Sequence, residues 1–292
     1  MEIAYLILSH KNPEQIIQLI HQLDAEDVCF IIHFDLNGRP ADYHKLLLTF
    51  EGKENVHLIS NRHRCYWGDF SLVSATLECI TYAFHYKIKF DYAILLSGQD
   101  FPIKKNEEIK TFLIENNGKE FIDAFQKPNS IWLNEGMKRL EYFHFNKFIR
   151  NNISYKKKVF LLITSLLMKF KIKRKLPTFE FYGGSQWWGL SKEFLEYVMN
   201  YIENNKKTVS FFKYVHVPDE IFFQTIINNS PFKDKVTHNL TYVDWDKEEK
   251  PAVFRTKDFN DLSNIKDKLF ARKFDIKIDK EIFDKIKEVL LK

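Results

Sequence analysis

The sequence predicts an α/β fold in which helices flank a mixed, mostly parallel central sheet. Two continuous apolar runs, residues 3–10 and 28–35, have the length and hydrophobicity of strands that are buried on both faces. The segment between them places apolar residues at helical spacing, with Asn12 as the expected N-cap and Pro13 as the first helical residue. A strand, a helix and a strand in this order form a βαβ unit, whose two strands are parallel.

Three further segments extend this unit into a nucleotide-binding type of α/β half, which we expect to cover residues 1–103. They are a short strand at 55–60, a strong helix at 71–86, and a fourth strand within 91–103 that ends in a Gly-Gln-Asp turn. In such sheets the ligand lies beyond the carboxyl ends of the strands. Asp35 and Asp100 both fall at such ends, where the alternative role is helix capping or turn formation.

Residues 104–292 are expected to form the acceptor-binding and catalytic half of the same single domain. Residues 104–180 are less regular than the rest. After them we expect an aromatic strand and an amphipathic helix within 182–202, a helix within 216–232, a strand at 239–245 and a C-terminal helix from about Asp279. Pro218, Asp219 and Glu220 lie in the first turn of the second of these helices.

Composition and charge narrow the possible functions. The 292 residues carry a formal charge of +5, a mildly basic balance that does not indicate a dedicated nucleic-acid binder. Three cysteines without metal spacing argue against a disulfide framework and for a reducing compartment. The N-terminus lacks the features of a signal peptide, and no run approaches the roughly 20 apolar residues of a membrane-spanning helix. The resulting prediction is a cytoplasmic protein.

The segment from Lys156 to Lys175 has an unusual pattern. Its apolar run, residues 159–168, is flanked by eight basic residues and is too short to span a bilayer. One interpretation is a peripheral contact with an anionic membrane at the inner face of the cell membrane, held by acyl contact and by charge. The alternative is a core helix with solvated basic ends.

Signatures of several enzyme classes are absent. The sequence has no G-x-G-x-x-G after the first strand, no G-x-x-x-x-G-K-[ST], no G-x-S-x-G and no Cys/His cluster with zinc spacing. The Asp-x-Asp metal motif of many sugar-nucleotide enzymes is missing too, because the fourth strand ends in SGQD. Glu220 is the candidate catalytic base, although a carboxylate at a helix start can simply interact with the helix dipole.

Seven short blocks occur in a family order between residues 4 and 275: AYLILSHKNP, IIHFD, YWGDFSLVSATL, LLSGQDFPIK, GGSQWWGLSKEFLEYV, VPDEIFFQTIINNSPF and LFARKFD. On these blocks the chain resembles the core-2/I-branching family of glycosyltransferases, and it is closer to the branch that contains the protein xylosyltransferases. The resemblance implies a Rossmann-like glycosyltransferase A-type fold and a UDP-sugar donor. It also implies inversion at the anomeric carbon, with no metal and no other cofactor.

The resemblance also implies roles for individual residues. Glu220 would be the general base that takes the proton of the acceptor hydroxyl, and Arg272 and Lys273 would bind the donor diphosphate. The residues expected near the uridine are Asp35, Trp67 and His10, and those expected near the transferred sugar or the acceptor are Asp100, Gln186, Trp187 and Trp245. Lys138 or Arg139 are further candidates for acceptor contacts.

The stretch LFARKFD has a physical reason to bind a phosphate. Arg272 and Lys273 stand between Phe270 and Phe274, which we expect to anchor the segment. A buried core would not tolerate both charges without an anionic partner. Departure of UDP develops negative charge on the diphosphate, and an enzyme without a divalent metal must supply fixed cations there. Arginine offers a bidentate fork and lysine a compact charge. The alternative is a surface Arg-Lys pair beside two core phenylalanines.

The chain departs from the family pattern at some positions. An arginine that another branch has before the Arg-Lys block has only Lys250 and Arg255 as candidates here, and a tyrosine expected beyond the acceptor tryptophan is Lys247. The cysteine pairs and the N-terminal anchor of the secreted animal members are absent, which favours a bacterial cytoplasmic enzyme.

The sequence therefore predicts a metal-independent inverting glycosyltransferase. It would move GlcNAc or a xylose-like sugar from a UDP-sugar to a hydroxyl of a glycan or lipid-linked glycan, in bacterial surface polysaccharide synthesis. One alternative is a metal-dependent nucleotide hydrolase or nucleotidyltransferase, with Asp35, Asp69 and Asp100 as metal ligands. Another is a lectin-like module that stacks sugars on its tryptophans.

Overall fold

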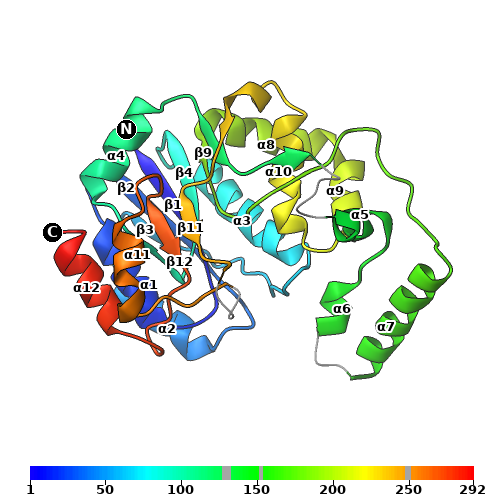
Figure 1. Cartoon of the computed structure of the whole chain (residues 1–292), viewed down its shortest axis with the longest axis horizontal. Helices are drawn as coiled ribbons and strands as arrows, with labels where there is room; N and C mark the ends of the chain where they lie inside the picture. The colour runs from blue at the N-terminus through cyan, green and yellow to red at the C-terminus, as the bar shows by residue number, and fades with distance from the viewer. Residues whose placement is uncertain (127–132, 151–153, 247–250) are drawn as a thin grey trace.

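The structure is a computed structural model that describes residues 1–126, 133–150, 154–246 and 251–292 (Figure 1). Within these residues the central sheet has seven strands in the order β10-β6-β9-β4-β1-β2-β3. The strand bounds are Ile3–Ser9 (β1), Val28–Phe34 (β2), Val56–Leu58 (β3), Tyr92–Ser97 (β4), Glu120–Ile122 (β6), Trp188–Ser191 (β9) and Val236–Thr237 (β10). β9 is antiparallel to β4 and β6, and the other neighbours are parallel. The predicted mixed, mostly parallel sheet is confirmed.

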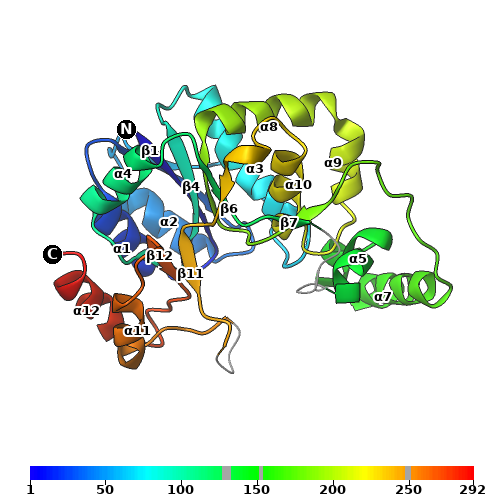
Figure 2. The ribbon, with the colours of Figure 1, turned by 45° about the horizontal axis from the view of Figure 1, so that its top comes forward.

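Helices cover both faces of this sheet (Figures 1 and 2). Successive side chains of β1 point to opposite faces, so Tyr5 and Leu6 belong to different apolar clusters. The cluster of Tyr5 includes residues of α1 (Pro13–Leu23), α2 (Pro40–Thr49), α4 (Asn106–Glu115), α11 (Phe259–Ser263) and α12 (Glu281–Val289). The cluster of Leu6 includes residues of α3 (Ser71–His85), α8 (Lys192–Asn204), α9 (Lys206–Phe212) and α10 (Phe222–Asn228). The core therefore consists of two layers that enclose the sheet.

The predicted cap of α1 is wrong in one respect. α1 begins at Pro13, as expected, but Asn12 lies in the left-handed region with φ 52° and makes no side-chain cap. Its amide instead donates to Asp275 Oδ1 at 2.9 Å. The side chain is used for a contact with the far end of the chain, which a local pattern does not reveal.

Other predicted elements exist but have different bounds. The helix within 216–232 is divided into a 3₁₀ turn, η1 (Pro218–Glu220), and α10, because Ile221 between them has a non-helical φ of −133°. The strand expected at 55–60 covers only Val56–Leu58, and the one expected at 239–245 covers only Thr241–Val243 (β11). Glu220 therefore lies at the end of a short turn and not inside a helix.

A second, three-stranded sheet stands beside the first, in the order β11-β12-β5 among the described residues. It joins β5 (Asp100–Pro102), which follows β4 closely, to β12 (Phe270–Arg272) near the C-terminus. β12 is antiparallel to β5, and the register sets Arg272 opposite Asp100. The pairing of these strands thus brings a cation from the end of the chain to the carboxyl edge of the central sheet.

The region that the sequence shows as irregular contains a projecting arm. After β7 (Phe125–Gln126) come α5 (Leu133–Glu141), α6 (Asn146–Arg150) and α7 (Ser154–Lys169), and the chain returns at β8 (Tyr182–Gly183). We call α6 and α7 the arm, because both stand away from the sheet at the right of Figure 1. Within the described residues no helix combines the length and apolarity needed to cross a membrane.

Candidate active site

A cavity of about 360 Å³ lies at the carboxyl edge of the central sheet, and we call it the sheet-edge cavity. Residues that follow β1, β2 and β4 meet there, as expected for an open α/β sheet. The predicted site residues in its lining are His10, Asp35, Trp67, Gln186, Trp187, Arg272 and Lys273. Most of the predicted site is therefore brought together, although its members come from segments far apart in the sequence.

Arg272 is held in one orientation at this cavity. Its Nη1 donates to Ser97 Oγ at 2.5 Å and to Asp100 Oδ1 at 2.8 Å. The guanidinium carbon lies 4.3 Å from the centroid of the Trp187 ring, within the range of a cation–π contact. With these contacts the side chain is only 15% exposed. The cation is preorganised, so little side-chain freedom remains to be lost when an anion binds.

Asp100 contacts Arg272 and is not among the described residues that line the cavity. It has no exposed surface, and its two oxygens also accept from the hydroxyl of Ser97 at 2.8 Å and from the Ser97 backbone N–H at 2.7 Å. Burial raises the pKa of Asp100, while the charge of Arg272 and the hydrogen bonds of Ser97 lower it. We expected Asp100 to contact the sugar or the acceptor. In the structure it instead positions Arg272.

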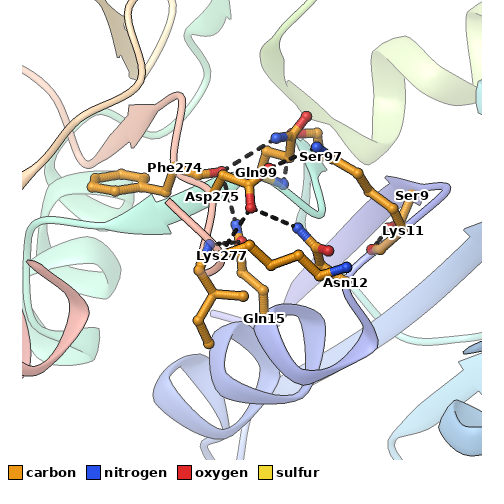
Figure 3. Close-up of polar contacts among 10 residues, drawn as sticks. Ser9, Lys11, Asn12, Gln15, Ser97, Gln99, Phe274, Asp275 and Lys277 are labelled. Atoms are coloured by element: carbon orange, nitrogen blue, oxygen red, sulfur yellow. Dashed lines mark hydrogen bonds and ion pairs between the residues drawn. The ribbon is translucent and has the colours of Figure 1, made fainter. Parts of the chain in front are cut away.

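The segment after Arg272 is tied to the loop after β1 and to the turn after β4 (Figure 3). The carbonyl of Phe274 accepts from the side-chain amides of Gln15 at 3.1 Å and Gln99 at 3.3 Å. Asp275 accepts from Asn12 and forms an ion pair with Lys11 at 2.6 Å. This network holds the cation-bearing segment against two strand ends of the sheet.

The two phenylalanines of the LFARKFD stretch anchor it in the core, as predicted. Phe270 and Phe274 have no exposed surface. Phe270 lies edge-on to Tyr5 of β1, and Phe274 packs against Phe101 and Phe283. The apolar frame therefore fixes the backbone on both sides of the cations while they face the cavity.

The residues expected near the uridine, Asp35, His10 and Trp67, line the same cavity. Asp35 Oδ1 accepts from the backbone N–H of Asn37 at 2.7 Å and of Cys65 at 3.1 Å. Its second oxygen has no protein partner within the described parts of the chain. Desolvation and the charge of Lys11 lower the pKa of His10, which favours the neutral imidazole. A carboxylate oxygen and a neutral imidazole are suitable partners for hydroxyl and N–H groups of a ligand.

Two tryptophans, Trp67 and Trp187, line the same cavity. Trp67 is 58% exposed and lies edge-on to His216 at a centroid distance of 5.4 Å. Its exposed face is suited to stacking on a flat ring. Trp187 is buried and already stacks on Arg272, so in this structure it supports the cation. Gln186 lies beside it in the lining.

Glu220 is not among the described residues that line the cavity. Its carboxylate is 30% exposed and forms an ion pair with Arg139 at 3.0 Å. Its carbonyl accepts from the backbone N–H of Gly184 at 2.9 Å, two residues before Gln186, and the N–H of Val217 donates to Gly68 beside Trp67. The turn that carries Glu220 is thus hydrogen-bonded to the two backbone segments that precede Trp187 and follow Trp67. The guess that Arg139 contacts an acceptor becomes, in the structure, a contact with the candidate base.

Some predicted residues lie elsewhere. Trp245 is 55% exposed beyond β11 and does not line the sheet-edge cavity. Lys247 and Lys250 lie outside the described residues. In contrast, the structure adds Lys11 and Ser97 to the lining, which the sequence analysis did not select. Lys11 belongs to the block AYLILSHKNP, and its place directly after a buried strand was the available signal.

The structure also bears on the metal-dependent alternative. Asp35, Asp69 and Asp100 hold separate sets of hydrogen bonds, to Cys65, Ser71 and Ser97 respectively among others. Across residues 1–126, 133–150, 154–246 and 251–292, no group of three or more His, Cys, Asp or Glu side chains is arranged to hold a metal ion. The three aspartates do not form a common site.

The sheet, its two helical layers and the cavity at the carboxyl edge define an open α/β protein with its candidate site at the usual place for this fold class. The family model of the core-2/I-branching enzymes matches residues 3–269. The chain belongs to this family. The match ends before Arg272, so the cation pair lies outside the matched residues.

Curated relatives include xylosyltransferases. The chain is 26% identical over 307 residues to xylosyltransferase 2 of Rattus norvegicus, which aligns 97% of this chain with 33% of the relative. It is 26% identical over 315 residues to xylosyltransferase oxt of Drosophila melanogaster, with 99% of this chain and 33% of the relative aligned. The chain therefore spans about one third of the length of these relatives.

Solved structures are less similar. The galactosyltransferase LgtC in complex with donor and acceptor sugar analogs is 8% identical and has a TM-score of 0.40, with 93% of this chain and 86% of that chain covered. A likeness of this size supports no conclusion about function.

Proposed function

We propose that the protein is an inverting glycosyltransferase that moves a sugar from a UDP-sugar to a hydroxyl group of a glycan acceptor. The observation that carries this proposal is Arg272, held by Asp100, Ser97 and Trp187 at a cavity on the carboxyl edge of the sheet. Fixed cations in a poorly solvated cleft are the strongest available means of stabilising a departing diphosphate. Membership in the core-2/I-branching family supports the same reaction class.

In the proposed reaction Glu220 accepts the proton of the acceptor hydroxyl, and Arg139 orients its carboxylate. The hydroxyl oxygen forms a bond to the anomeric carbon on the face opposite to the leaving group, while the bond from that carbon to the phosphate oxygen breaks. UDP leaves with the bonding electrons, and the cations Arg272 and Lys273 stabilise the charge that develops on it. Asp35, His10 and Trp67 hold the uridine.

We further propose that the reaction needs no divalent metal and that the donor sugar is GlcNAc or a xylose-like sugar. Two cations at the leaving group would do the work of the metal. The acceptor would be a glycan or a lipid-linked glycan in bacterial surface polysaccharide synthesis. The protein would contact the inner face of an anionic membrane peripherally, through the segment from Lys156 to Lys175.

A thermal-shift panel of UDP, UDP-GlcNAc, UDP-xylose and GDP-mannose in excess EDTA tests the donor site. A ligand present at about 100 times its Kd stabilises the folded form by about 2.7 kcal/mol, which corresponds to roughly 5 °C in the unfolding midpoint. We expect that shift with uridine ligands and not with GDP-mannose. No shift with any uridine ligand, or a shift only after Mn²⁺ is added, would refute the proposed donor site.

A further inference from the structure

A second cavity, of about 590 Å³, is lined partly by residues of the arm, and we call it the arm cavity. Its lining combines residues of the loop before α3 with residues of the arm and of the loop after α9. The charged side chains in this lining are those of Arg62, Arg64, Lys147, Lys213 and Asp69. None of them has a role in the proposed sugar transfer.

The charges of the arm cavity are unbalanced. Asp69 is the only carboxylate among the described residues of this lining, and its two oxygens already accept from the backbone N–H groups of Ser71 at 2.9 Å and Lys147 at 3.1 Å. Among the described residues, neither of the two lysines nor either arginine forms an ion pair with a carboxylate. Four cations around one hollow repel one another, and an anion in the hollow would relieve that repulsion.

Two aromatic residues that line the arm cavity also pack against α7. Phe145 and Phe148 line the cavity, and both rings pack against Phe160 of α7, at centroid distances of 5.1 and 4.3 Å. Phe160, Thr164 and Leu167 are partly buried and recur at helical spacing, so they mark the face of α7 that packs.

A second apolar stripe of α7 is exposed in the structure. Val159, Leu162, Ile163 and Leu166 recur at positions i, i+3, i+4 and i+7, and all four are exposed, Leu162 by 60%. An apolar stripe of this kind on a soluble protein marks a contact with another surface. Lys157, Lys158 and Lys169 lie near its ends and are also exposed.

We propose that the arm cavity binds the phosphate headgroup of an anionic membrane phospholipid, whose acyl chains contact the exposed stripe of α7. The proposal deepens the peripheral membrane contact proposed above and rests on it. The charge pattern favours a lipid over a second copy of this chain, because two copies joined through α7 would bring their lysines together. An anionic lipid combines the two chemistries that the arm presents, a phosphate for the cations and a hydrocarbon chain for the stripe.

Binding of dihexanoyl phosphatidylglycerol, kept below its micelle concentration, tests the headgroup site by calorimetric titration. We expect wild type to bind it more tightly than dihexanoyl phosphatidylcholine. The double variant Lys147→Gln/Lys213→Gln should bind it roughly 30-fold more weakly, from a loss of about fivefold for each lysine. The matched variant Lys157→Gln/Lys169→Gln removes the same charge from α7, outside the cavity, and should bind the short-chain lipid as wild type does.

Sedimentation with phosphatidylcholine vesicles, with and without phosphatidylglycerol, separates this proposal from the membrane contact itself. We expect binding only to the anionic vesicles, reduced by Lys147→Gln/Lys213→Gln and by Leu162→Ser/Leu166→Ser. Vesicle binding that needs the leucines but not Lys147 and Lys213 would overturn the headgroup site and leave the membrane contact standing. No vesicle binding, with a dimer in light scattering that Leu162→Ser/Leu166→Ser abolishes, would overturn both in favour of a second copy.

An experiment can also distinguish a wrong assignment of the lipid site from a wrong assignment of the enzymatic function. Lys147 and Lys213 do not line the sheet-edge cavity, so the double variant should keep the thermal shift that UDP produces in wild type. Loss of that shift in the double variant would mean that the two cavities are not independent, and would contradict the assignment of the arm cavity to a lipid.

Discussion

The two cavities of this protein present their positive charge in opposite ways. In the sheet-edge cavity Arg272 pairs with Asp100 and Lys11 pairs with Asp275, and buried strands or loops hold both pairs. In the arm cavity the described cations have no carboxylate partner and extend from loops and a short helix. Under the two proposals, the difference corresponds to two kinds of anion recognition: a preorganised one, suited to charge that develops in a reaction, and a looser one, suited to attraction toward a charged surface.

The largest expected effect concerns the proposed base. Replacing Glu220 by Gln keeps the size of the side chain but removes the proton acceptor, so kcat should fall by about 10² to 10⁴. The ion pair between Arg139 and Glu220 is lost in the same variant, and Arg139→Met, which removes this pair but keeps the carboxylate, therefore serves as the control for a merely structural effect. Turnover of Glu220→Gln at the wild-type rate, measured with the donor identified by thermal shift, would show that another group is the base.

Arg272→Met tests whether the preorganised cation is also a structural element. It leaves the buried carboxylate of Asp100 without its ion-pair partner, which typically costs about 3 to 5 kcal/mol of unfolding free energy. The variant Asp100→Asn/Arg272→Met, with no charge left buried, should recover much of this loss in urea unfolding. Equal stabilities of the single and double variants would contradict the dependence of Asp100 on Arg272.

Asp219, beside the proposed base, should make stability depend on pH. Burial, followed by the charge of Glu220, raises the pKa of Asp219 from 3.8 to about 7, and its Oδ1 has no hydrogen-bond partner among the described residues. Between these two pKa values the folded state keeps a proton that the unfolded state has lost. The stability contributed by this group is thus complete below about pH 4 and is lost as the pH rises through 7.

Urea unfolding at pH 5 and pH 8 measures this contribution. Wild type should lose about 2 to 3 kcal/mol from this group between the two pH values, since one pKa unit corresponds to about 1.4 kcal/mol. Asp219→Asn cannot titrate and should show a loss smaller by that amount. Parallel pH profiles for the two proteins would place the pKa of Asp219 near its ordinary value.

Lys11 should have a smaller effect on the donor site. It lines the sheet-edge cavity, its side chain is 39% exposed, and Asp275 already neutralises it in part. Lys11→Met should therefore weaken UDP binding by only about threefold to fivefold, as for other partly exposed charge pairs. Lys11→Arg should retain the wild-type Kd in a UDP titration. A loss of about tenfold or more, beyond what a partly exposed pair contributes, would make Lys11 a principal phosphate contact.

The smallest expected effect concerns the exposed stripe of the arm. Leu162→Ser/Leu166→Ser removes two leucines that contact little of the folded chain, so the unfolding free energy should change by no more than about 0.5 kcal/mol for each substitution. Thermal unfolding in the absence of lipid measures this. Strong destabilisation would mean that the stripe is packed in the free protein, and would remove the contrast between the two regions.

Local patterns in the sequence were enough to predict the layered α/β fold and the anchoring of the LFARKFD stretch. Continuous apolar runs mark strands that are buried on both faces, and Phe270 and Phe274 are fully buried, as their place around the two cations suggested. The bounds of η1 and α10, and the use of the Asn12 side chain, could not be predicted, because a backbone turn at Ile221 and a contact with Asp275 decided them.

By itself, the sequence determined which segments are strands and helices and which cations stand in an apolar frame, because periodicity and burial depend on neighbouring residues. Only the tertiary structure decided that Asp100 and Ser97 hold Arg272, that Asp275 holds Lys11, and that four cations meet beside the arm. These contacts join residues that are distant in the sequence, and they depend on strand register and loop packing. A pattern of local hydrophobicity carries no information about either.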